Sequence, residues 1–324
     1  MGSAPKRVLV VDPIAAAGEA LLARSVEVLR SPDSDPATIR RLASEVDGII
    51  TRSKLPDDVF QAAPRVRAVA IHGTGTDLVP LADATARRVM VSNIPGGNAQ
   101  SVAEYCVMAM LVLSRGVLGI INTLKTKPWD AARALGAGAH EIAGMTLGLV
   151  GVGEIGKRVA RIARQGFGMR VLGNQRRLEG LPADAEPTAL ENLISISDFV
   201  VVTCPLNKDT HHLFNRQRIQ AMKPTAWLIN VGRGPVIEEQ ALIAALRERR
   251  IAGAMLDVYE HYRLPPGHPL FALDNAVLTP HLAGMTVESR ARMSVAAAEE
   301  ILRMLAGERP KNFVNPEAMN VAHH

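Results

Sequence analysis

The feature that most limits the fold of this chain is an apolar stretch that runs into a glycine-rich turn, Thr146-Leu-Gly-Leu-Val-Gly-Val-Gly-Glu-Ile-Gly156. The apolar part predicts a buried strand, and residues 157–165 after the turn have the composition of a helix. Gly151 permits a tight turn, Gly153 lets the backbone approach a ligand, and Gly156 allows close packing of helix and strand. Such a helix start stabilises an anion through unpaired N–H groups and the helix dipole. A glycine motif alone is weak evidence, but strand, turn and helix in this order predict a dinucleotide-binding domain.

The length of 324 residues allows about two domains, and the stretch before the glycine turn is too long to be a tail. In both halves, strand-like runs alternate with helical ones, which predicts parallel sheets with crossover helices. The expected strands are 7–11, 48–50, 68–71, 89–92, 146–150, 170–172, 199–203, 227–230 and 252–256. The expected helices are 15–22, 56–63, 81–88, a long helix that follows Asn98 toward residue 124, 155–165, 189–194 and 238–247.

The composition, 48% hydrophobic and 21% charged, is that of a soluble globular protein with a full core. The apolar run at 8–11 is too short for a signal peptide, and charged residues interrupt the most apolar segment, 102–124, which predicts a buried helix rather than a membrane span. Cys106 and Cys204 lie inside apolar runs, so buried free thiols are expected and neither a disulfide nor a metal site. We therefore expect a cytoplasmic protein with no membrane partner.

The formal net charge of +5 raises the question of nucleic acid as a partner. The basic residues are dispersed, aromatic residues make up only 3%, and no nucleic-acid-binding motif is present. We expect no nucleic-acid partner. An anionic small-molecule substrate or cofactor explains the charge equally well, and so does a mildly basic solvated surface.

Three further blocks are rich in chemically active residues: Asn230-Val-Gly-Arg-Gly234, Leu256-Asp-Val-Tyr-Glu260 and Thr279-Pro-His281. Each lies at or just beyond the carboxyl end of an expected strand, which is where open parallel sheets bind ligands. Taken alone, Arg233 is consistent with a surface arginine and His281 with a histidine beside a proline. Next to a nicotinamide site, however, they supply a fixed cation for a carboxylate and a proton donor that titrates near neutrality.

With these blocks in place, the chain resembles the D-isomer-specific 2-hydroxyacid dehydrogenases, the family that contains D-3-phosphoglycerate dehydrogenase and the glyoxylate/hydroxypyruvate reductases. The resemblance extends along nearly the whole chain. Its landmarks are His72-Gly-Thr-Gly-Thr-Asp77, Asn98-Ala-Gln-Ser-Val-Ala-Glu104, the glycine turn, Thr203-Cys-Pro-Leu206, residues 230–234 with Ala241-Leu242, Gly253-Ala-Met-Leu-Asp257 and Thr279-Pro-His281.

The resemblance implies an α/β fold of two Rossmann-like/flavodoxin-like parallel-sheet domains. The cofactor domain, 99–288, would be inserted in a substrate domain made of 1–98 and 289–324, with the active site in the cleft. It also implies a homodimer, in which the helix after Asn98 and the loop around Trp129 form part of the interface.

Roles carry over to matching positions. By resemblance, Arg233 binds the substrate carboxylate and orients its carbonyl, His281 is the acid/base, and Asp257 holds the nicotinamide amide. Consecutive backbone N–H groups at a strand end can complete the carboxylate site. The expected substrate-binding residues are His72, Gly73, Thr74, Gly75 and Arg233. The expected cofactor-binding residues are Gly151, Gly153, Glu154, Ile155, Gly156, Gln175, Arg176, Arg177, Thr203, Cys204, Pro205, Val231, Gly232, Asp257, His281 and Gly284.

The chain departs from the family pattern at the catalytic glutamate, which lies five residues after the aspartate that Asp257 matches. Here that position is Tyr262. We therefore expect Tyr262 to take the third catalytic position beside Arg233 and His281. Glu260 is the alternative partner of the histidine, although the family often carries a non-catalytic glutamate at that place.

A second departure concerns the acidic residue that accepts the ribose hydroxyls of NAD. Gln175, Arg176 and Arg177 stand at the end of the expected second strand instead. An aspartate there repels a 2′-phosphate, whereas a neutral residue followed by arginines favours it. NADP is therefore the expected cofactor, with NAD as the other possibility; the alternative interpretation is two ordinary surface arginines.

These observations favour an NAD(P)-dependent oxidoreductase that acts on a small anionic 2-oxo acid or D-2-hydroxy acid. The alternative, supported by the missing glutamate alone, is a dinucleotide-sensing protein like the corepressors of the same fold. His72 and Tyr262 can both face the substrate, and the alternative for His72 is a strand-end residue that binds no ligand. The residues do not specify which acid is the substrate. They also do not say whether His323 and His324 belong to the natural chain.

Overall fold

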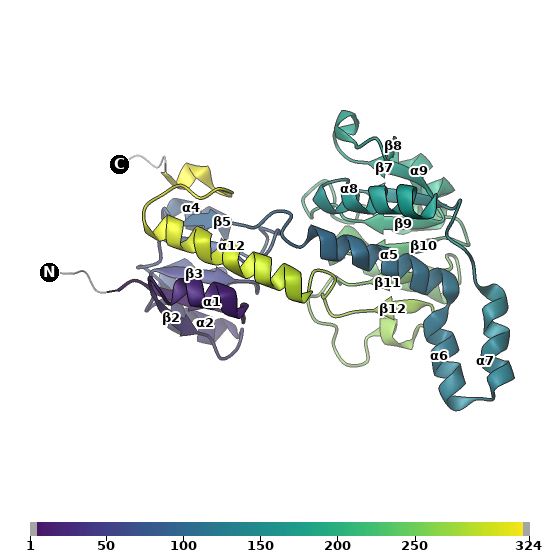
Figure 1. Cartoon of the computed structure of the whole chain (residues 1–324), viewed down its shortest axis with the longest axis horizontal. Coiled ribbons are helices and arrows are strands. Elements are labelled where there is room, and N and C mark those ends of the chain that lie inside the picture. Colours follow the sequence, from purple (N-terminus) through teal and green to yellow (C-terminus); the bar gives the residue numbers. More distant parts are fainter. Residues whose placement is uncertain (1–4, 320–324) are drawn as a thin grey trace. The chain divides into compact units, whose positions relative to one another are not determined.

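The computed structural model describes residues 5–319, so His323 and His324 lie outside it. The chain divides into two compact units, one made of 1–98 with 285–324 and one made of 99–284. The second unit is thus inserted in the sequence of the first (Figure 1). The chain returns to the first unit at Met285, a few residues before the position 289 expected from sequence and just before the last long helix.

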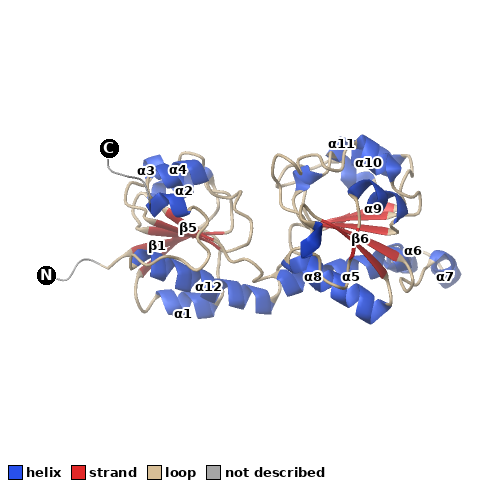
Figure 2. Ribbon diagram, turned by 90° about the horizontal axis from the view of Figure 1, so that it is seen from above, coloured by secondary structure: helices blue, strands red, loops and turns tan. Residues whose placement is uncertain are grey.

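The first unit contains a five-stranded parallel sheet in the order β2-β1-β3-β4-β5, which is the flavodoxin-like order. Its strands are β1 (Arg7–Val10), β2 (Glu27–Arg30), β3 (Gly48–Thr51), β4 (Ala68–Ile71) and β5 (Met90–Ser92). Helices cover both faces (Figure 2). One face carries α1 (Ala16–Leu22) and α12 (Val287–Leu305), and the other carries α2 (Pro36–Ala43), α3 (Val59–Ala62) and α4 (Leu81–Ala86). A short 3-10 helix, η6 (Pro316–Met319), ends the described chain.

The central strands of this sheet are almost entirely apolar because both faces are covered. Every residue of β3 and β4 is buried. Helix α12 packs closely on α1, and the absence of a side chain at Gly18 permits this: a Cβ there would lie only 2.6 Å from the carbonyl oxygen of Ser294. This close approach brings the middle of α12 to the carboxyl ends of the sheet strands.

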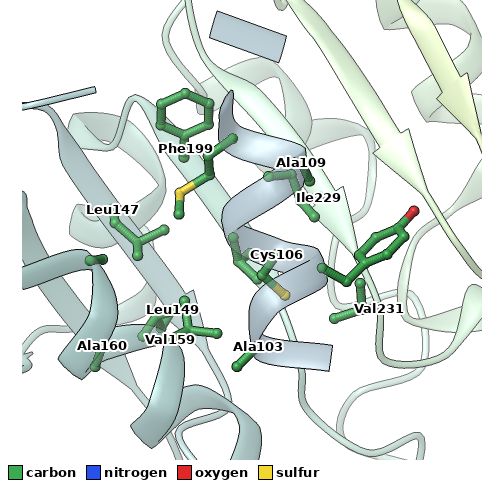
Figure 3. Close-up of a cluster of buried hydrophobic side chains, with 14 of the residues drawn as sticks. Ala103, Cys106, Ala109, Leu147, Leu149, Val159, Ala160, Phe199, Ile229 and Val231 are labelled. Carbon is green, nitrogen blue, oxygen red and sulfur yellow. The ribbon is translucent and has the colours of Figure 1, made fainter. Parts of the chain in front are cut away.

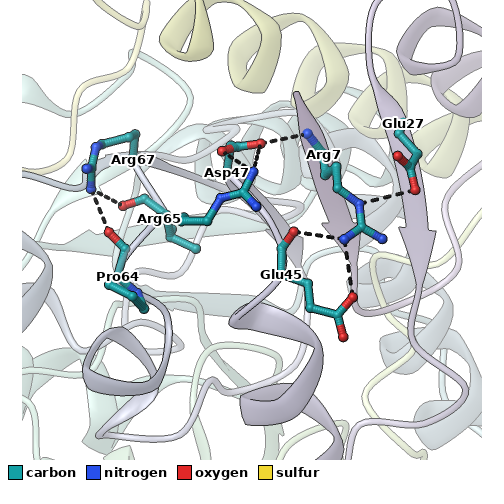
Figure 4. A network of polar contacts seen from close by, with 8 residues as sticks. Arg7, Glu27, Glu45, Asp47, Pro64, Arg65 and Arg67 are labelled. Atoms are coloured by element: carbon teal, nitrogen blue, oxygen red, sulfur yellow. Dashed lines mark hydrogen bonds and ion pairs between the residues drawn. The ribbon is translucent and has the colours of Figure 1, made fainter. Parts of the chain in front are cut away.

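Polar contacts connect the amino ends of the strands, at the opposite end of the same sheet (Figure 4). The Arg7 guanidinium pairs with Glu27 at 3.1 Å and with Glu45 at 3.2 Å. The Asp47 carboxylate accepts the Arg7 N–H at 2.8 Å and the Arg65 guanidinium at 3.0 Å. Arg7 and Asp47 are partly buried, but their partners Glu27, Glu45 and Arg65 are largely exposed. Water and salt therefore screen these pairs, and their role is to align strand ends rather than to supply much stability.

The second unit contains a seven-stranded parallel sheet in the order β12-β11-β10-β9-β6-β7-β8, a Rossmann-like order with one added strand. Its strands are β6 (Thr146–Val150), β7 (Arg170–Asn174), β8 (Glu186–Pro187), β9 (Phe199–Val202), β10 (Trp227–Asn230), β11 (Gly253–Leu256) and β12 (Ala276–Leu278). Together, the two sheets confirm the predicted fold class.

Helices also cover both faces of this second sheet (Figure 2). One face carries α5 (Ala99–Arg115) and α8 (Glu154–Arg161), which continues as a π-helical turn, η2 (Ile162–Gly166). The other carries α9 (Leu190–Ile196), α10 (Arg216–Ala221) and α11 (Glu239–Arg247). The remaining helices are α6 (Val117–Thr126), α7 (Trp129–Leu135), η1 (Gly136–Gly138), η3 (Leu178–Gly180), η4 (Gly234–Val236) and η5 (Pro269–Ala272).

Helix α5 packs on the sheet through small side chains, as Figure 3 shows for Ala103, Cys106 and Ala109. They face strand residues that include Leu147 and Phe199, and all of these side chains are buried. Both cysteines of the chain are free and buried, as the sequence predicted. Within residues 5–319, no group of three or more metal-ligating side chains is present.

The expected single buried helix over 102–124 is wrong in its second half. Gly116 adopts the left-handed conformation with φ +59°, which ends α5 and redirects the chain into α6. Helix α6 has no buried residue in this chain. In the described part of the chain, no single helix has the length and apolarity of a membrane span, and only the pair α5 and α6, bent by 56°, meets those two criteria jointly.

Candidate active site

The glycine turn after β6 has the geometry that a pyrophosphate requires. Gly151 has φ +91°, and a Cβ there would lie 2.6 Å from the Cys204 nitrogen. A Cβ at Gly156 would lie 2.6 Å from the Gly151 oxygen, whereas one at Gly153 would meet nothing within 4 Å. The outer glycines are therefore needed for packing, and the middle one faces open space beside the first N–H groups of α8. These residues fit a bound dinucleotide.

The loops that follow β6, β9 and β10 contact one another at the carboxyl edge of the sheet. The Thr203 hydroxyl donates to the Gly151 oxygen. A Cβ at Gly232 would lie 2.8 Å from the Cys204 oxygen, and the Val231 N–H donates to the Val202 oxygen at 3.2 Å. The structure thus brings together most of the expected cofactor-binding residues: Gly151, Gly153, Glu154, Ile155, Gly156, Thr203, Cys204, Pro205, Val231 and Gly232.

The residues expected to contact the ribose follow β7. The Gly151 N–H donates to the Asn174 oxygen at 2.8 Å, so the end of β7 adjoins the glycine turn. The Gln175 amide donates to the Arg177 carbonyl at 2.8 Å. Arg176 and Arg177 are exposed, and neither forms an ion pair with another described residue. Two exposed arginines, each without an ion pair to another described residue, therefore lie at the position where the resemblance places an aspartate that selects NAD.

Arg233 is held by the loop after β10. The buried Asn230 side chain donates to the Arg233 carbonyl at 3.1 Å and accepts the Gly232 N–H at 3.1 Å. A Cβ at Gly234 would lie 1.7 Å from the Tyr259 oxygen. The glycine therefore allows the Arg233 loop to run directly against the loop that follows β11.

Asp257 organises the turn that carries His281. The Asp257 carboxylate is 1% exposed and accepts the Thr279 hydroxyl at 2.7 Å and the N–H groups of Leu282 at 2.8 Å and Ala283 at 2.9 Å. The Asp257 carbonyl accepts the His281 N–H at 2.9 Å. His281 itself has φ +54°, a conformation uncommon outside glycine. Beyond the role that the resemblance implies, Asp257 thus holds the backbone on both sides of His281. Gly284, another expected cofactor contact, follows this turn at the end of the unit.

Tyr262 and Glu260 differ in what they face. The Tyr262 ring lies edge-on to the His281 imidazole, with centroids 6.0 Å apart and planes at 71°. The Glu260 carboxylate instead lies 3.5 Å from Nε2 of His212. Tyr262 is 64% exposed in this chain, so its ring is accessible to a ligand as well as to the histidine.

A buried contact between Glu239 and His268, which the sequence analysis missed, anchors the loop bearing Tyr262. The Glu239 carboxylate, at the start of α11, lies 3.1 Å from Nε2 of His268. Its second oxygen accepts the Glu260 N–H at 3.2 Å. Glu239 therefore holds both ends of the loop between residues 260 and 268. The stretch Leu264-Pro-Pro-Gly-His-Pro-Leu270 resembles the family's usual sequence after the Tyr262 position, but nothing in it indicated the partner of His268.

His72 ends β4 in the first unit and is 2% exposed. Its Nε2 lies 3.0 Å from the Ser294 hydroxyl, which also accepts the Ala15 N–H at 2.8 Å. Burial, with the positive charges of Arg52 and Arg290, lowers the pKa of His72 from 6.5 to about 4. The ring is therefore neutral near pH 7 and joins β4 to α12.

In the turn at residues 73–75, the carbonyl groups of Gly73 and Thr74 accept hydrogen bonds. The Gly73 oxygen accepts the Ile94 N–H at 2.8 Å, and the Thr74 oxygen accepts the Asn93 amide at 2.6 Å. The Thr74 hydroxyl donates to the Ile94 oxygen at 3.2 Å. By contrast, the three N–H groups of the turn do not donate to any residue in the described part of the chain. They remain available as donors to an anion.

Asp12 is a second residue that the sequence analysis missed. It follows β1, and its carboxylate accepts the N–H groups of Arg52 at 2.7 Å and Ser53 at 2.8 Å and the Ser53 hydroxyl at 2.6 Å. Three donors on one carboxylate fix the loop after β3. This loop carries Arg52, one of the two cations near His72.

Comparison with known proteins identifies the family. Residues 107–283 match the model of the NAD binding domain of the D-isomer specific 2-hydroxyacid dehydrogenases. The chain belongs to this family. A glyoxylate reductase of Thermofilum pendens is 39% identical over 276 residues, which cover 83% of this chain and 80% of the relative.

Solved structures of similar proteins agree with the fold. The NADPH-dependent glyoxylate/hydroxypyruvate reductase of Sinorhizobium meliloti, in complex with NADP and malonate, is 28% identical with a TM-score of 0.84, covering 97% of this chain and 98% of that one. The NAD-dependent formate dehydrogenase of Staphylococcus aureus, in complex with NAD, is 25% identical with a TM-score of 0.85, covering 95% and 98%. This dehydrogenase is therefore an oxidoreductase with a nicotinamide cofactor.

Proposed function

We propose that this dehydrogenase reduces small anionic 2-oxo acids, glyoxylate and hydroxypyruvate foremost, to the hydroxy acids, with the D configuration wherever a stereocentre forms, and uses NADPH. The observation that carries the proposal is the packing of the Arg233 loop against the loop that follows Asp257, through Gly234. It places the Arg233 loop after β10 beside the loop after β11, and the His281 turn follows β12, the next strand of the sheet. The names of the glyoxylate reductases that the chain resembles support the same substrate class.

In this proposal the glycine turn and the loops after β9 and β10 hold the cofactor. When bound, the nicotinamide supplies the hydride that goes to the 2-oxo carbon. Arg233 binds the carboxylate of the acid and polarises its 2-oxo group, an electrostatic effect typically worth about 3 kcal/mol per donor. His281 donates a proton to the oxygen of that group, so the product is the neutral alcohol.

The first unit contributes a second set of anion donors. The three N–H groups of residues 73–75 bind carboxylate oxygens, as consecutive backbone N–H groups do in other anion sites. His72 keeps its hydrogen bond to Ser294 when the substrate binds. Its buried ring thereby fixes the direction in which residues 73–75 leave β4. Its contribution to substrate binding is thus through the turn rather than through its ring.

Tyr262 takes the place of the glutamate that usually partners the histidine. Its hydroxyl and ring edge orient the imidazole without supplying a negative charge. The edge-on contact with His281 supports this role, and the engagement of Glu260 with His212 argues against Glu260 as the partner.

NADPH is proposed as the preferred cofactor because Arg176 and Arg177, just after β7, are exposed and form no ion pair with another described residue. A guanidinium and a phosphate form charge-assisted, often bidentate hydrogen bonds. Gln175 has no charge to repel a 2′-phosphate.

A homodimer is proposed from the exposed apolar side chains of α6 and α7. Leu118, Ile121 and Leu124 are 43%, 42% and 46% exposed, and Trp129 is 66% exposed. A second copy of the chain would remove this apolar surface from water. Light scattering after gel filtration should give twice the chain mass, and Ile121→Lys should give the monomer mass. Gln61→Lys, an equal charge change on the other unit, should leave the dimer intact.

The experiment that tests the reaction is a cofactor and substrate panel. NADPH or NADH is mixed with glyoxylate, hydroxypyruvate, pyruvate and 2-oxoglutarate, and absorbance in the nicotinamide band is followed. Oxidation of NADPH by glyoxylate and hydroxypyruvate supports the proposal. Tight NADPH binding with no turnover of any acid would contradict it and favour the dinucleotide-sensing alternative.

A further inference from the structure

The Tyr105 hydroxyl reaches the active-site turn from the buried face of α5. Tyr105 is 6% exposed, and its oxygen is hydrogen-bonded to the Thr279 hydroxyl. The Thr279 hydroxyl in turn lies 2.7 Å from an oxygen of Asp257, to which it donates. A threonine hydroxyl has one proton, and Thr279 donates it to Asp257. Tyr105 must therefore be the donor to Thr279, so the three groups form a relay that points toward Asp257.

The relay ends on the residue that holds the His281 turn. Asp257 accepts the N–H groups of Leu282 and Ala283 and, through its carbonyl, that of His281. His281 has φ +54°, and a non-glycine residue keeps such a conformation only where its surroundings enforce it. The direction of the imidazole thus depends on how firmly Asp257 is placed.

The Tyr105 hydroxyl is not required for packing. Tyr105 lies on the apolar face of α5 that packs in the hydrophobic core. A phenylalanine at position 105 would fill the same space without bringing a polar group that needs a partner. Burial raises the pKa of Tyr105 well above its usual value, and the nearby Asp257 charge adds to the effect. The phenol therefore keeps its proton and remains a donor throughout the range in which the enzyme works.

We propose that Tyr105 and Thr279 are positioning residues for the proton donor: their hydroxyls form a relay that fixes Asp257 and, through it, the orientation of the His281 imidazole. The inference rests on the proposed function, in which His281 protonates the substrate oxygen. Neither hydroxyl touches the substrate. Both act on the angle and distance at which the proton is delivered.

The test compares variants that remove one hydroxyl and keep the shape. Tyr105→Phe and Thr279→Val should each lower kcat for reduction by about tenfold, well short of the roughly hundredfold that a 1 Å misplacement can cost. Thr279→Ser keeps the hydroxyl and should stay within about twofold of the wild type. Ser114→Ala, which removes another buried hydroxyl of α5 away from the site, should leave kcat unchanged and serves as the matched control.

Three readouts separate positioning from a loss of stability. The solvent deuterium isotope effect on kcat should rise in Tyr105→Phe and Thr279→Val, because proton delivery becomes slower relative to the other steps. The dissociation constant of NADPH should stay within about twofold. The double variant should be no slower than Thr279→Val alone, since two residues of one relay are not additive.

Each outcome decides the matter. A Tyr105→Phe enzyme with normal kcat and an unchanged isotope effect overturns the relay, whether or not the variant is less stable. A double variant in which the losses of kcat from the two single variants multiply also overturns it. If Thr279→Val does not fold, Tyr105→Phe and Thr279→Ser still decide. His281→Asn tests the underlying function separately, because its full activity would refute His281 as proton donor, whereas an inactive His281→Asn beside a normal Tyr105→Phe refutes the relay alone.

Discussion

The Tyr262 ring meets the His281 imidazole edge-on, with ring centroids 6.0 Å apart and the planes at 71°. A phenol in this place can hydrogen-bond a ring nitrogen and fix the ring, but it brings no charge to stabilise the imidazolium. A carboxylate at the same place would stabilise it. If Tyr262 is the partner of His281, as proposed, the histidine has an orienting group without an electrostatic one, and the pH dependence of reduction should show the difference.

Tyr262→Glu should move the alkaline limb of the kcat/KM profile for reduction upward by about one pH unit, the usual effect of a nearby opposite charge. Reduction needs the protonated histidine, and the new carboxylate keeps it protonated to a higher pH. The profile is measured with glyoxylate and saturating NADPH in the wild type and the variant. Glu260→Gln is the matched control and should not shift the limb. An unmoved limb in Tyr262→Glu together with a downward shift in Glu260→Gln would assign the partner role to Glu260.

Cofactor choice should depend on the end of β7. Gln175→Asp places a carboxylate where it accepts ribose hydroxyls and repels a 2′-phosphate. We expect the wild type to favour NADPH in kcat/KM by roughly tenfold to a hundredfold, since a charge-assisted hydrogen bond is worth about 1.5–3 kcal/mol, and the variant to lose or reverse that preference. Steady-state kinetics with both cofactors measures the ratio. Arg176→Ala and Arg177→Ala should weaken NADPH and leave NADH nearly unchanged; equal or better use of NADH by the wild type would contradict the prediction.

The roles of Arg233 and His281 predict different kinetic signatures. Arg233→Ala should raise KM for the 2-oxo acid and lower kcat, because the guanidinium both binds and polarises. Arg233→Lys, which keeps the charge but loses the bidentate geometry, should fall between the alanine variant and the wild type. His281→Ala should lower kcat by about a hundredfold or more with nearly unchanged cofactor affinity, as expected for loss of a general acid. Turnover near the wild-type rate in both alanine variants would show that other groups do the chemistry.

The elements that the sequence predicted are those whose local pattern and tertiary role agree. Buried strands such as β4 and β9 are apolar along their whole length because helices cover both faces of the sheet. The glycines of the turn after β6 were predictable because Gly151 and Gly156 meet steric limits that any such turn imposes, while Gly153 leaves space for a ligand. By contrast, β2 is a half-exposed edge strand of four residues, and β12 has three half-buried residues, so neither carries a periodic signal. Helix α2 was overlooked although Asp35 and Pro36 form an N-terminal capping pattern.

The site residues that were missed are those whose meaning depends on a distant partner. Asp12 is 40 residues from the Arg52 N–H that it accepts, and Tyr105 is 174 residues from Thr279. Glu239 and His268 look like ordinary polar residues until the fold buries them together. Motif matching finds groups that touch the ligand, because the chemistry limits which residues can serve. The groups that hold them in place are limited only by geometry, which one sequence does not contain.

The burial of His72 predicts a measurable dependence of stability on pH. Burial first, and then Arg52 and Arg290, lowers its pKa from 6.5 to about 4. Between these two values the unfolded chain binds a proton that the folded chain does not, so the free energy of unfolding decreases as the pH falls through this window. Above pH 6.5 the residue contributes no pH dependence. From pH 7.5 to pH 5.0 we expect a loss of about 2 kcal/mol from this residue, at about 1.4 kcal/mol per unit below 6.5.

His72→Gln removes the titration and keeps a polar side chain of similar reach. Urea unfolding at pH 7.5 and 5.0 should therefore show a smaller decrease in the variant than in the wild type, by about 2 kcal/mol. Ser294→Ala is the matched control, because it removes the hydrogen-bond partner of the ring and leaves the histidine buried beside the same two arginines. It should be destabilised at both pH values and keep the pH dependence of the wild type. The same decrease in His72→Gln as in the wild type would mean that the ring is protonated at little cost in the folded chain, and that the two arginines lie too far from it to matter.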